Sequence, residues 1–320
     1  GGPPCQPFSL GGLARAALDP RDMFPAYTEV LSTLHPRAFI VENVKGLTRE
    51  SFRDYYDYIL MRLQHPLVKA REDETWRDHA ERLSREHTAG IHDELRYEVV
   101  PTVVDAADYG VAQRRHRVIM VGFRSDVEAK WSFPRPTHSQ AALFDAQQEG
   151  RYWRWHGIRP GEGIKGHLGN PSLRPWRTVR DALVGLPDPH RPRLSAKFLN
   201  HDLREGAKTY AGHTGSPLDE PSKAIKAGVH GVPGGENMMR FPDGSVRYYT
   251  VREAARVQGF PDGYEFSGSW GEGLRQIGNA VPVELARVIA SSVAIALHED
   301  AARKAMDSAL FELEAEHEAA

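Results

Sequence analysis

The sequence predicts an α/β fold, and three observations support this prediction. Two short apolar runs, 36–44 and 117–122, have the length and composition of strands, and the residues up to about 125 alternate between strand-like and helix-like patterns. The interval from about 126 to 270 is rich in Gly, Pro, His and Trp with weak periodicity, which indicates a smaller, irregular domain. A chain of 320 residues with 40% hydrophobic content can bury cores for two such domains.

The only cysteine of the chain lies near its first residue, in Gly1-Gly2-Pro3-Pro4-Cys5-Gln6-Pro7-Phe8-Ser9. Prolines on both sides of Cys5 exclude a regular helix and remove backbone donors. A structural cysteine is usually a small buried hydrophobe on a strand or helix, and this stiff loop does not match that description. We therefore interpret Cys5 as a nucleophile that the loop presents to a substrate.

The apolar run 36–44 is predicted to be a fully buried strand that ends in a carboxylate and an amide. Its Glu42 would lie at the carboxyl end of the strand, where open α/β sheets place their ligands. The second strand follows a basic run in which alternation places Gln113, Arg115 and Arg117 on one side. A cysteine, a strand-end carboxylate and a one-sided arginine pair form a set suited to covalent catalysis.

Residues 274–297 are predicted to form a loop followed by a helix. Apolar residues recur at helical spacing over 283–290, and Pro282 suits the first helical turn. The following stretch, 301–320, is predicted to be an acidic helical tail, since the residues from Glu299 to Glu318 include seven acidic and two basic side chains.

The formal net charge of −2 does not by itself favour nucleic acid, but the charge is unevenly distributed. Between Arg151 and His213 there are twelve Lys and Arg against five Asp and Glu. This basic segment could neutralise phosphates while the acidic tail balances the total. Three tryptophans are interleaved with its arginines, which favours phosphate contact, although the same rings could form the core of the smaller domain. These tryptophans are Trp153, Trp155 and Trp176.

Several classes of protein are disfavoured by the composition. No run of 18 apolar residues occurs, which argues against a membrane span, and no signal peptide is recognised. One cysteine cannot form an intrachain disulfide, which suits a reducing cytoplasm. No metal-ligand set is expected. We therefore expect a cytoplasmic protein.

Seven short motifs follow one another along the chain. They are Pro3-Pro4-Cys5-Gln6, Asp19-Pro20-Arg21-Asp22, Glu42-Asn43-Val44, Ala107-Asp108-Tyr109-Gly110-Val111, Gln113-x-Arg115-x-Arg117, the run from Arg252 to Asp262, and Gln276-Ile277-Gly278-Asn279-Ala280-Val281-Pro282-Val283. Individually these motifs are weak, but five or more in one order, from residue 1 to about 290, are specific. Together they resemble the cytosine-5 DNA methyltransferase family, which implies a bacterial protein associated with the nucleoid.

The resemblance implies a Rossmann-like sheet that carries S-adenosylmethionine-dependent methyl transfer to a cytosine flipped out of double-stranded DNA. Carbon 5 of cytosine is too poor a nucleophile to take the methyl group directly, so a thiolate first attacks carbon 6. This makes Cys5 the nucleophile and Glu42 the acid near ring nitrogen 3. Arg117 would donate to the base oxygen, and Arg115 would support the thiol loop.

The resemblance also implies binding residues and a division into domains. Cofactor contacts are expected from Pro4, Phe24, Asn279, Ala280 and Val281, and DNA contacts from Ser9, Gln113 and Arg252. Residues 1–125 would form the catalytic domain, 126–270 the target recognition domain, 271–300 the return to the catalytic domain, and 301–320 the acidic tail. The enzyme would belong to a restriction-modification system.

Two segments depart from the family pattern. Residues 64–94 are predicted to be a charged, solvated helical insertion without a catalytic role. The glycine-rich turn that binds the cofactor should precede Cys5 by several dozen residues, so N-terminal strands of the sheet are expected to be missing. The one Gly-x-Gly-x-x-Gly match, 161–166, lacks a preceding strand and is interpreted as a loop. We expect this sequence to be part of a longer enzyme. The less favoured alternative is a split enzyme in which a second, complementing polypeptide carries the missing part.

Two alternatives to a DNA methyltransferase remain open. The first is a tRNA cytosine-5 methyltransferase of the same fold, although the long basic interval before Arg252 favours DNA. The second is a non-catalytic DNA-binding subunit of a split enzyme. Against it stand the four intact catalytic candidates, which a silent relative would tolerate losing.

Overall fold

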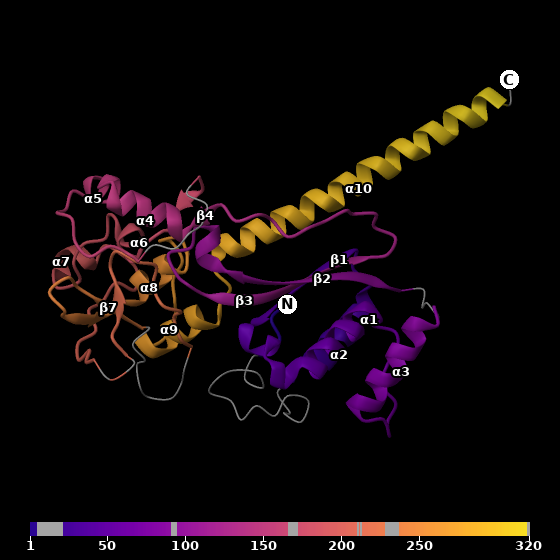
Figure 1. Ribbon diagram of the computed structural model, residues 1–320, viewed down its shortest axis with the longest axis horizontal. Helices are drawn as coiled ribbons and strands as arrows, with labels where there is room; N and C mark the ends of the chain where they lie inside the picture. Colours follow the sequence, from indigo (N-terminus) through magenta and orange to yellow (C-terminus); the bar gives the residue numbers. More distant parts are fainter. Residues whose placement is uncertain are drawn as a thin grey trace. The chain divides into compact units, whose positions relative to one another are not determined.

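The computed structural model shows a chain of mixed helices and strands (Figure 1). It describes residues 1–4, 22–90, 95–165, 172–209, 211, 213–227 and 237–318. Cys5, Ser9 and the Asp19-Pro20-Arg21 part of a predicted motif lie outside these residues. The mixture of helices and strands confirms the α/β prediction at this level. Residues 161–165 form neither helix nor strand, as expected for this glycine-rich match.

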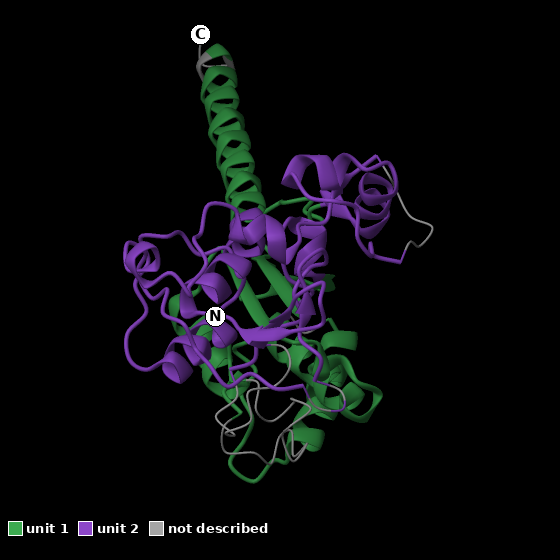
Figure 2. Ribbon diagram, turned by 90° about the vertical axis from the view of Figure 1, so that its left-hand side faces the viewer, with its two compact units in different colours: residues 1–104, 116–134, 289–320 green, residues 105–115, 135–288 purple. Residues whose placement is uncertain are grey.

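The chain divides into two compact units (Figure 2). Unit 1 contains residues 1–104, 116–134 and 289–320, and unit 2 contains residues 105–115 and 135–288. Each unit therefore combines segments that are far apart in the sequence. The functional division into catalytic and target recognition domains stays a prediction.

Unit 1 is built on a three-stranded sheet in the order β1-β3-β2. Its strands are β1 (Ala38–Val44), β2 (Tyr97–Asp105) and β3 (His116–Arg124). Strands β1 and β3 are antiparallel, with Ala38 opposite Phe123 and Val44 opposite Arg117. Both predicted strands are thereby confirmed. The prediction that β1 is fully buried is wrong for one face, because its residues alternate between buried and half-buried positions.

Three helices of unit 1 pack against this sheet and one another. They are α1 (Phe24–Leu34), α2 (Arg53–Gln64) and α3 (Trp76–Thr88), and the 3-10 turns Lys45–Thr48 and Glu50–Phe52 connect β1 to α2. A proline in its first turn suits the start of α1, and His35 ends it in the left-handed conformation. The shared core joins helix and strand residues, among them Leu31, Val41, Ile59, Leu83 and Met120.

Helix α3 lies in the segment predicted to be a solvated insertion. Thr75 caps the helix and forms a reciprocal capping box with Asp78, a signal that predicts a helix start from sequence alone. The helical prediction is confirmed, but the helix is not solvated on all sides. His79 and Leu83 are fully buried, and Leu83 belongs to the core of unit 1. The physical reason is that the amphipathic face of α3 packs on α2.

His79 makes the stability of unit 1 sensitive to acid. Its Nε2 donates to the carbonyl oxygen of Val68 at 3.0 Å, so its Nδ1 must accept from the Tyr58 hydroxyl at 2.8 Å. Burial lowers the pKa of His79 below its ordinary value of 6.5; nearby Arg62 and Arg82 lower it further, and Glu74 opposes them. The fold therefore holds the neutral ring.

We expect the thermal midpoint Tm to fall as the pH drops below about 6.5, because the unfolded chain then binds a proton that the folded ring resists. Replacement His79→Phe should lower Tm at neutral pH but flatten its decline between pH 7.5 and 5.5. The exposed His35, replaced by asparagine, is the matched control, since asparagine tolerates the same left-handed backbone. An equally steep decline in the His79→Phe protein would contradict the assignment.

Unit 2 is irregular and rich in loops, as the composition of its sequence predicts. Its longest described strands have three residues. The strands of this unit form two small sheets, β4-β5 and β6-β7-β8. The elements in order are the 3-10 turn Ala106–Tyr109, β4 (His138–Ser139), α4 (Gln140–Gln148), α5 (Arg151–His156), β5 (Arg174–Pro175), α6 (Val179–Leu183), α7 (Pro192–Ser195), β6 (Ser216–Pro217), β7 (Met238–Arg240), β8 (Val246–Tyr248), α8 (Val251–Val257) and α9 (Trp270–Asn279).

The loop predicted to begin at residue 274 begins only after Asn279, because α9 occupies residues 274–279 as a helix. Ser269 caps α9 by accepting from the backbone of Glu272, and Leu274 and Ile277 bury one face. Three glycines lower the intrinsic helix propensity of this segment, which is why its sequence favours a loop. Packing of the apolar face overrides that preference.

The last helix, α10 (Val283–Glu318), is continuous. It confirms a helix from residue 283 and a helical tail, but it does not break near residue 300. Together with α9 it gives one stretch, Trp270–Ala315, that by length and apolar composition alone would suffice for a membrane span. Of the 18-residue apolar window in this stretch, 28% is buried, and a single helix that meets these criteria is weak evidence of a membrane span. Within unit 1 the helix is anchored at buried Asp300, which bonds Arg37 at 2.7 Å.

Candidate active site

The end of β1 carries the predicted acid Glu42. The carboxylate Oε1 lies 2.5 Å from Nε of Arg117 on β3, and both side chains are mostly but not fully buried. Antiparallel pairing explains this contact, because Val44 opposes Arg117 and Glu42 is two residues before Val44 on the same face. The structure thus brings together two of the four predicted catalytic residues, which are 75 positions apart in the sequence.

The segment leading to Cys5 runs beside β1. The backbone nitrogen of Gly1 donates to the Ile40 carbonyl at 2.6 Å, and the backbone nitrogen of Glu42 donates to the Gly1 carbonyl at 2.9 Å. Further on, the side chain of Asn43 donates to the Pro3 carbonyl at 3.2 Å. These bonds advance along both segments in the same direction, so the chain reaches exposed Pro4 at the carboxyl end of β1.

Glu42 also faces this segment. A Cβ added to Gly2 would lie 3.7 Å from Oε2 of Glu42, so the carboxylate borders the backbone three residues before Cys5. Cys5 itself lies outside the described residues, and its place opposite Glu42 stays a prediction. An acid, a guanidinium and the approach to a thiol nevertheless meet at one strand end, where a base could be held and protonated.

Arg115 is placed in unit 2, under the turn that follows α9. Its guanidinium donates to the carbonyl of Gly278 at 2.5 Å, of Ala280 at 3.3 Å and of Ile225 at 3.0 Å. Gly278 is required there, because a Cβ would collide with the backbone of residues 226–227. The structure therefore gives Arg115 a role in holding this turn. Its predicted support of the thiol loop concerns residues outside the described ranges and stays a prediction.

A buried pair of glutamines completes the support of the turn. Gln113 donates to the side-chain oxygen of Gln258 at 2.5 Å, and the amide of Gln258 donates to the carbonyls of Ile277 at 3.0 Å and Ala280 at 2.8 Å. Both glutamine side chains are fully buried. Because buried polar groups need partners, this network fixes the backbone that presents Asn279.

Asn279, Ala280 and Val281 lie on this supported turn. The side chain of Asn279 is exposed and makes no hydrogen bond within the part of the chain that the structure describes, while Ala280 and Val281 are half-buried. An exposed amide on a rigid turn suits a ligand contact, so these three cofactor candidates remain available.

Three other predicted binding residues are held within the fold, and their binding roles stay predictions. Gln113 is predicted to contact DNA, but it is fully buried and its amide serves Gln258 and the backbone of Ile225. Arg252 is likewise fully buried, and its guanidinium donates to the carbonyls of Leu199, Pro261 and Tyr264. Phe24, predicted at the cofactor, is part of the core of unit 1. Their side chains are occupied by the fold itself.

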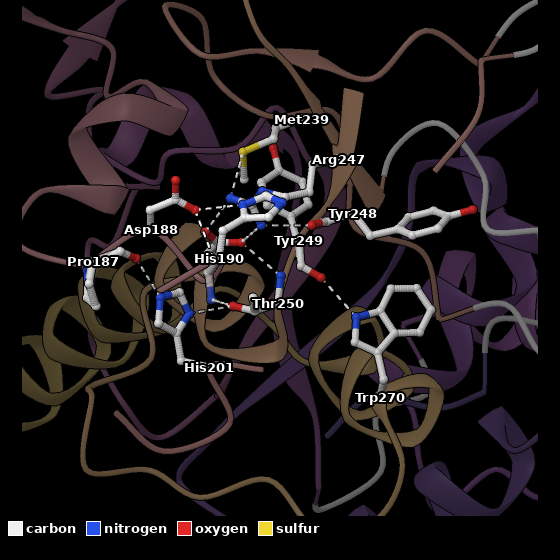
Figure 3. Close-up of polar contacts among 11 residues, drawn as sticks. Pro187, Asp188, His190, His201, Met239, Arg247, Tyr248, Tyr249, Thr250 and Trp270 are labelled. Carbon is white, nitrogen blue, oxygen red and sulfur yellow. Dashed lines mark hydrogen bonds and ion pairs between the residues drawn. The ribbon is translucent and has the colours of Figure 1, made fainter. Parts of the chain in front are cut away.

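Hydrogen bonds around Thr250 hold the start of α8, the helix that carries Arg252 (Figure 3). Thr250 caps the helix, and its hydroxyl bonds Nδ1 of buried His201 at 2.8 Å. His201 in turn donates from Nε2 to the carbonyl of Pro187, while the Trp270 indole donates to the carbonyl of Tyr249. These bonds hold α8 rigidly from its first residue, and Gln258 follows its last.

Sequence reasoning missed Asn43 and Gln258 as site residues. Asn43 fixes Pro3 and is buried, and Gln258 carries the turn with Asn279. Both lie inside the quoted motifs, which was the available signal. Their roles depend on which polar groups become buried together, and local patterns do not show this.

Replacement Gln258→Leu is expected to lower the free energy of unfolding by roughly 1–3 kcal/mol, the cost of leaving the buried Gln113 amide without its acceptor. Urea unfolding followed by tryptophan fluorescence measures this change. The control Gln276→Leu removes one bond, to the Ser267 carbonyl, at the surface of α9 and should cost less than about 1 kcal/mol. Equal costs for the two variants would contradict the role of the buried pair.

A family comparison identifies the protein class. The model of the C-5 cytosine-specific DNA methylases matches residues 1–65 and 77–294, and the chain belongs to this family. It is a methyltransferase that acts on carbon 5 of cytosine in DNA with S-adenosylmethionine as the methyl donor. The match omits residues 66–76. This gap falls inside the predicted insertion, residues 64–94, and spans fewer residues.

Individual relatives agree with the family match. The type II methyltransferase M.AplI of Arthrospira platensis is 28% identical over 310 residues, which cover 95% of this chain and 70% of M.AplI. M.NgoPII of Neisseria gonorrhoeae is 29% identical over 316 residues, covering 92% and 75%. The crystal structure of a DNA modification methyltransferase encoded within an Escherichia coli prophage superposes with a TM-score of 0.51 at 21% identity, over 93% of this chain and 78% of that chain. This last likeness concerns the fold.

Proposed function

We propose that this enzyme modifies one short DNA sequence in a restriction-modification system and that it does so through a covalent bond to Cys5. The observation that carries this proposal is the contact of Glu42 with Arg117 beside the segment that leads into Cys5. The type II designation of its relatives supports the restriction-modification role.

In the proposed mechanism the Cys5 thiolate attacks carbon 6 of a flipped-out cytosine, and a carbon–sulfur bond forms. The electron pair displaced from the ring's double bond makes carbon 5 nucleophilic, while Glu42 supplies a proton to ring nitrogen 3. Arg117 orients Glu42 and donates to the base oxygen. After the methyl group is added, loss of the carbon-5 proton expels the Cys5 thiolate and restores the aromatic ring.

Residues of the supported turn suit the methyl donor. Asn279, Ala280 and Val281 would contact S-adenosylmethionine, since the Asn279 amide is exposed on a backbone fixed by Arg115. Pro4, in unit 1, stays a separate candidate for a cofactor contact. When bound, this cofactor supplies an electrophilic methyl group on a sulfonium. The chain's own contribution is to orient that group and to keep the turn from moving.

The finer features of the prediction are part of the same proposal. The Rossmann-like form of the sheet rests on the family and on the order β1-β3-β2. Residues 126–270 would read the target sequence, supported by the excess of basic side chains from Arg151 to His213. We place the enzyme in the cytoplasm with the host DNA.

The proposal is tested by sequencing 5-methylcytosine in the genome of a host that carries the full-length gene encoding this chain. A single short sequence should be methylated at nearly all of its copies. The matched control is the same host with Cys5→Ser in that gene, which should lose this methylation. An unchanged methylation pattern in the control strain would refute the proposal.

A further inference from the structure

Unit 2 contains a hollow of about 890 Å³ that the methyl-transfer mechanism does not use. Its walls come from α5, the segment 175–177, α6 and the segment 259–262. Its described lining includes none of the predicted catalytic or cofactor residues. The volume lies in the range typical of sites for small organic ligands.

One wall of the hollow offers an aromatic face. Trp155 lines it and is 79% exposed, in contrast to the neighbouring Trp153, which is buried in the core of unit 2. Val184, also largely exposed, and the ring of Phe260 line the same space. The sequence left open whether the three tryptophans form a core or contact a ligand. Trp153 and Trp176 belong to the core, and Trp155 is free to stack on a planar ring.

The same hollow carries available positive charge. Its two carboxylates already have partners, since Asp181 bonds His156 at 3.0 Å and Asp262 pairs with Arg256 at 2.6 Å. Arg177 is exposed and makes no hydrogen bond or ion pair with the described residues.

Arg151 is available as well. Among the residues that the structure describes it pairs only with Glu149, and both side chains are more than half exposed. Such a surface pair contributes about 0–1 kcal/mol and exchanges readily for a stronger anion. Two guanidinium groups can therefore turn toward a phosphate.

We propose that this hollow binds one unpaired nucleotide, with its base stacked on Trp155 and its phosphate held by Arg177 and Arg151. A nucleotide joins a planar base to a phosphate dianion, so it matches the aromatic wall and the two guanidinium groups at once. A base inside a duplex is stacked on both sides and has no free face to offer. The nucleotide could come from a free mononucleotide or from an extrahelical position in DNA. The binding chemistry is the same for both sources.

Calorimetric titration of the chain with thymidine 5′-monophosphate and with thymidine tests the proposal. The monophosphate should bind more tightly, and Trp155→Ala should weaken it by about five- to 150-fold, the range for one stacking contact. Arg177→Ala should weaken the monophosphate about two- to fivefold without changing thymidine. The control Arg154→Ala changes an exposed arginine of α5 outside the lining and should leave both affinities unaltered.

Two DNA duplexes separate the sources, one fully paired and one with a single unpaired thymidine. Preference for the unpaired duplex that disappears in Trp155→Ala assigns the site to DNA, and binding of the monophosphate alone assigns it to free nucleotides. Either result supports the site. If neither probe binds, or if Trp155→Ala binds both as tightly as the unaltered chain, the proposal is wrong, whatever the outcome for methyl transfer.

Discussion

Replacement of Cys5 by serine is expected to abolish the covalent complex that the enzyme forms with duplex DNA containing 5-fluorocytosine in its target sequence. A serine hydroxyl is a far weaker nucleophile than a thiolate at neutral pH, so carbon 6 is not attacked. Fluorine at carbon 5 leaves no proton to remove after methylation, so the complex of the unaltered enzyme persists. Denaturing electrophoresis measures it as a band of increased mass.

The sequence makes this test unusually clean. Cys5 is the only cysteine of the chain, so any thiol-linked complex must involve it. Duplex DNA with ordinary cytosine serves as the control, because its complex resolves after methyl transfer. A band of equal intensity from the Cys5→Ser protein would remove Cys5 from the mechanism.

Replacement Glu42→Gln is expected to slow methyl transfer by roughly 10²–10⁴-fold, the usual loss when a positioned acid is removed. Glutamine keeps the size of the side chain but has no proton to give, and it loses the ionic contact with Arg117. Single-turnover transfer of a radiolabelled methyl group measures the chemical step directly. Complex formation with 5-fluorocytosine DNA should slow in parallel, since Glu42 acts at the attack on carbon 6.

The matched control is Glu50→Gln. Glu50 is an exposed carboxylate in the 3-10 turn after β1 and has no predicted role, so its loss should leave the rate unaltered. A normal rate for Glu42→Gln would place the acid elsewhere. A similar loss in both variants would show a general effect of charge rather than catalysis by Glu42.

The sequence predicted much of the fold because strands and helices depend on neighbouring residues. The apolar runs that form β1 and β3 are continuous and short, and the charged segment 64–94, predicted to be helical, contains α3. Helix α9 was missed because its formation does not depend on neighbouring residues alone. Its glycines lower local propensity, while the burial of its apolar face is decided by the rest of unit 2.

The candidate site shows the same limit more sharply. Alternation correctly predicted that Gln113 and Arg115 share a side while Arg114 points away, and the first two are buried where Arg114 is half exposed. It could not predict what that side faces. Gln113 meets Gln258, and Arg115 meets the turn after α9, because segments more than a hundred residues apart pack together.

By itself, the sequence determined the family of this protein, through an order of motifs that includes one thiol and an acid at a strand end. Only the tertiary structure decided which polar side chains are enclosed by the fold and which stay available at the proposed site. Arg252 and Arg117 are the same residue type, yet one is enclosed by carbonyl oxygens and the other meets Glu42 at a partly open strand end. The physical reason is that burial and partner are properties of long-range packing, while residue type and spacing are properties of the chain.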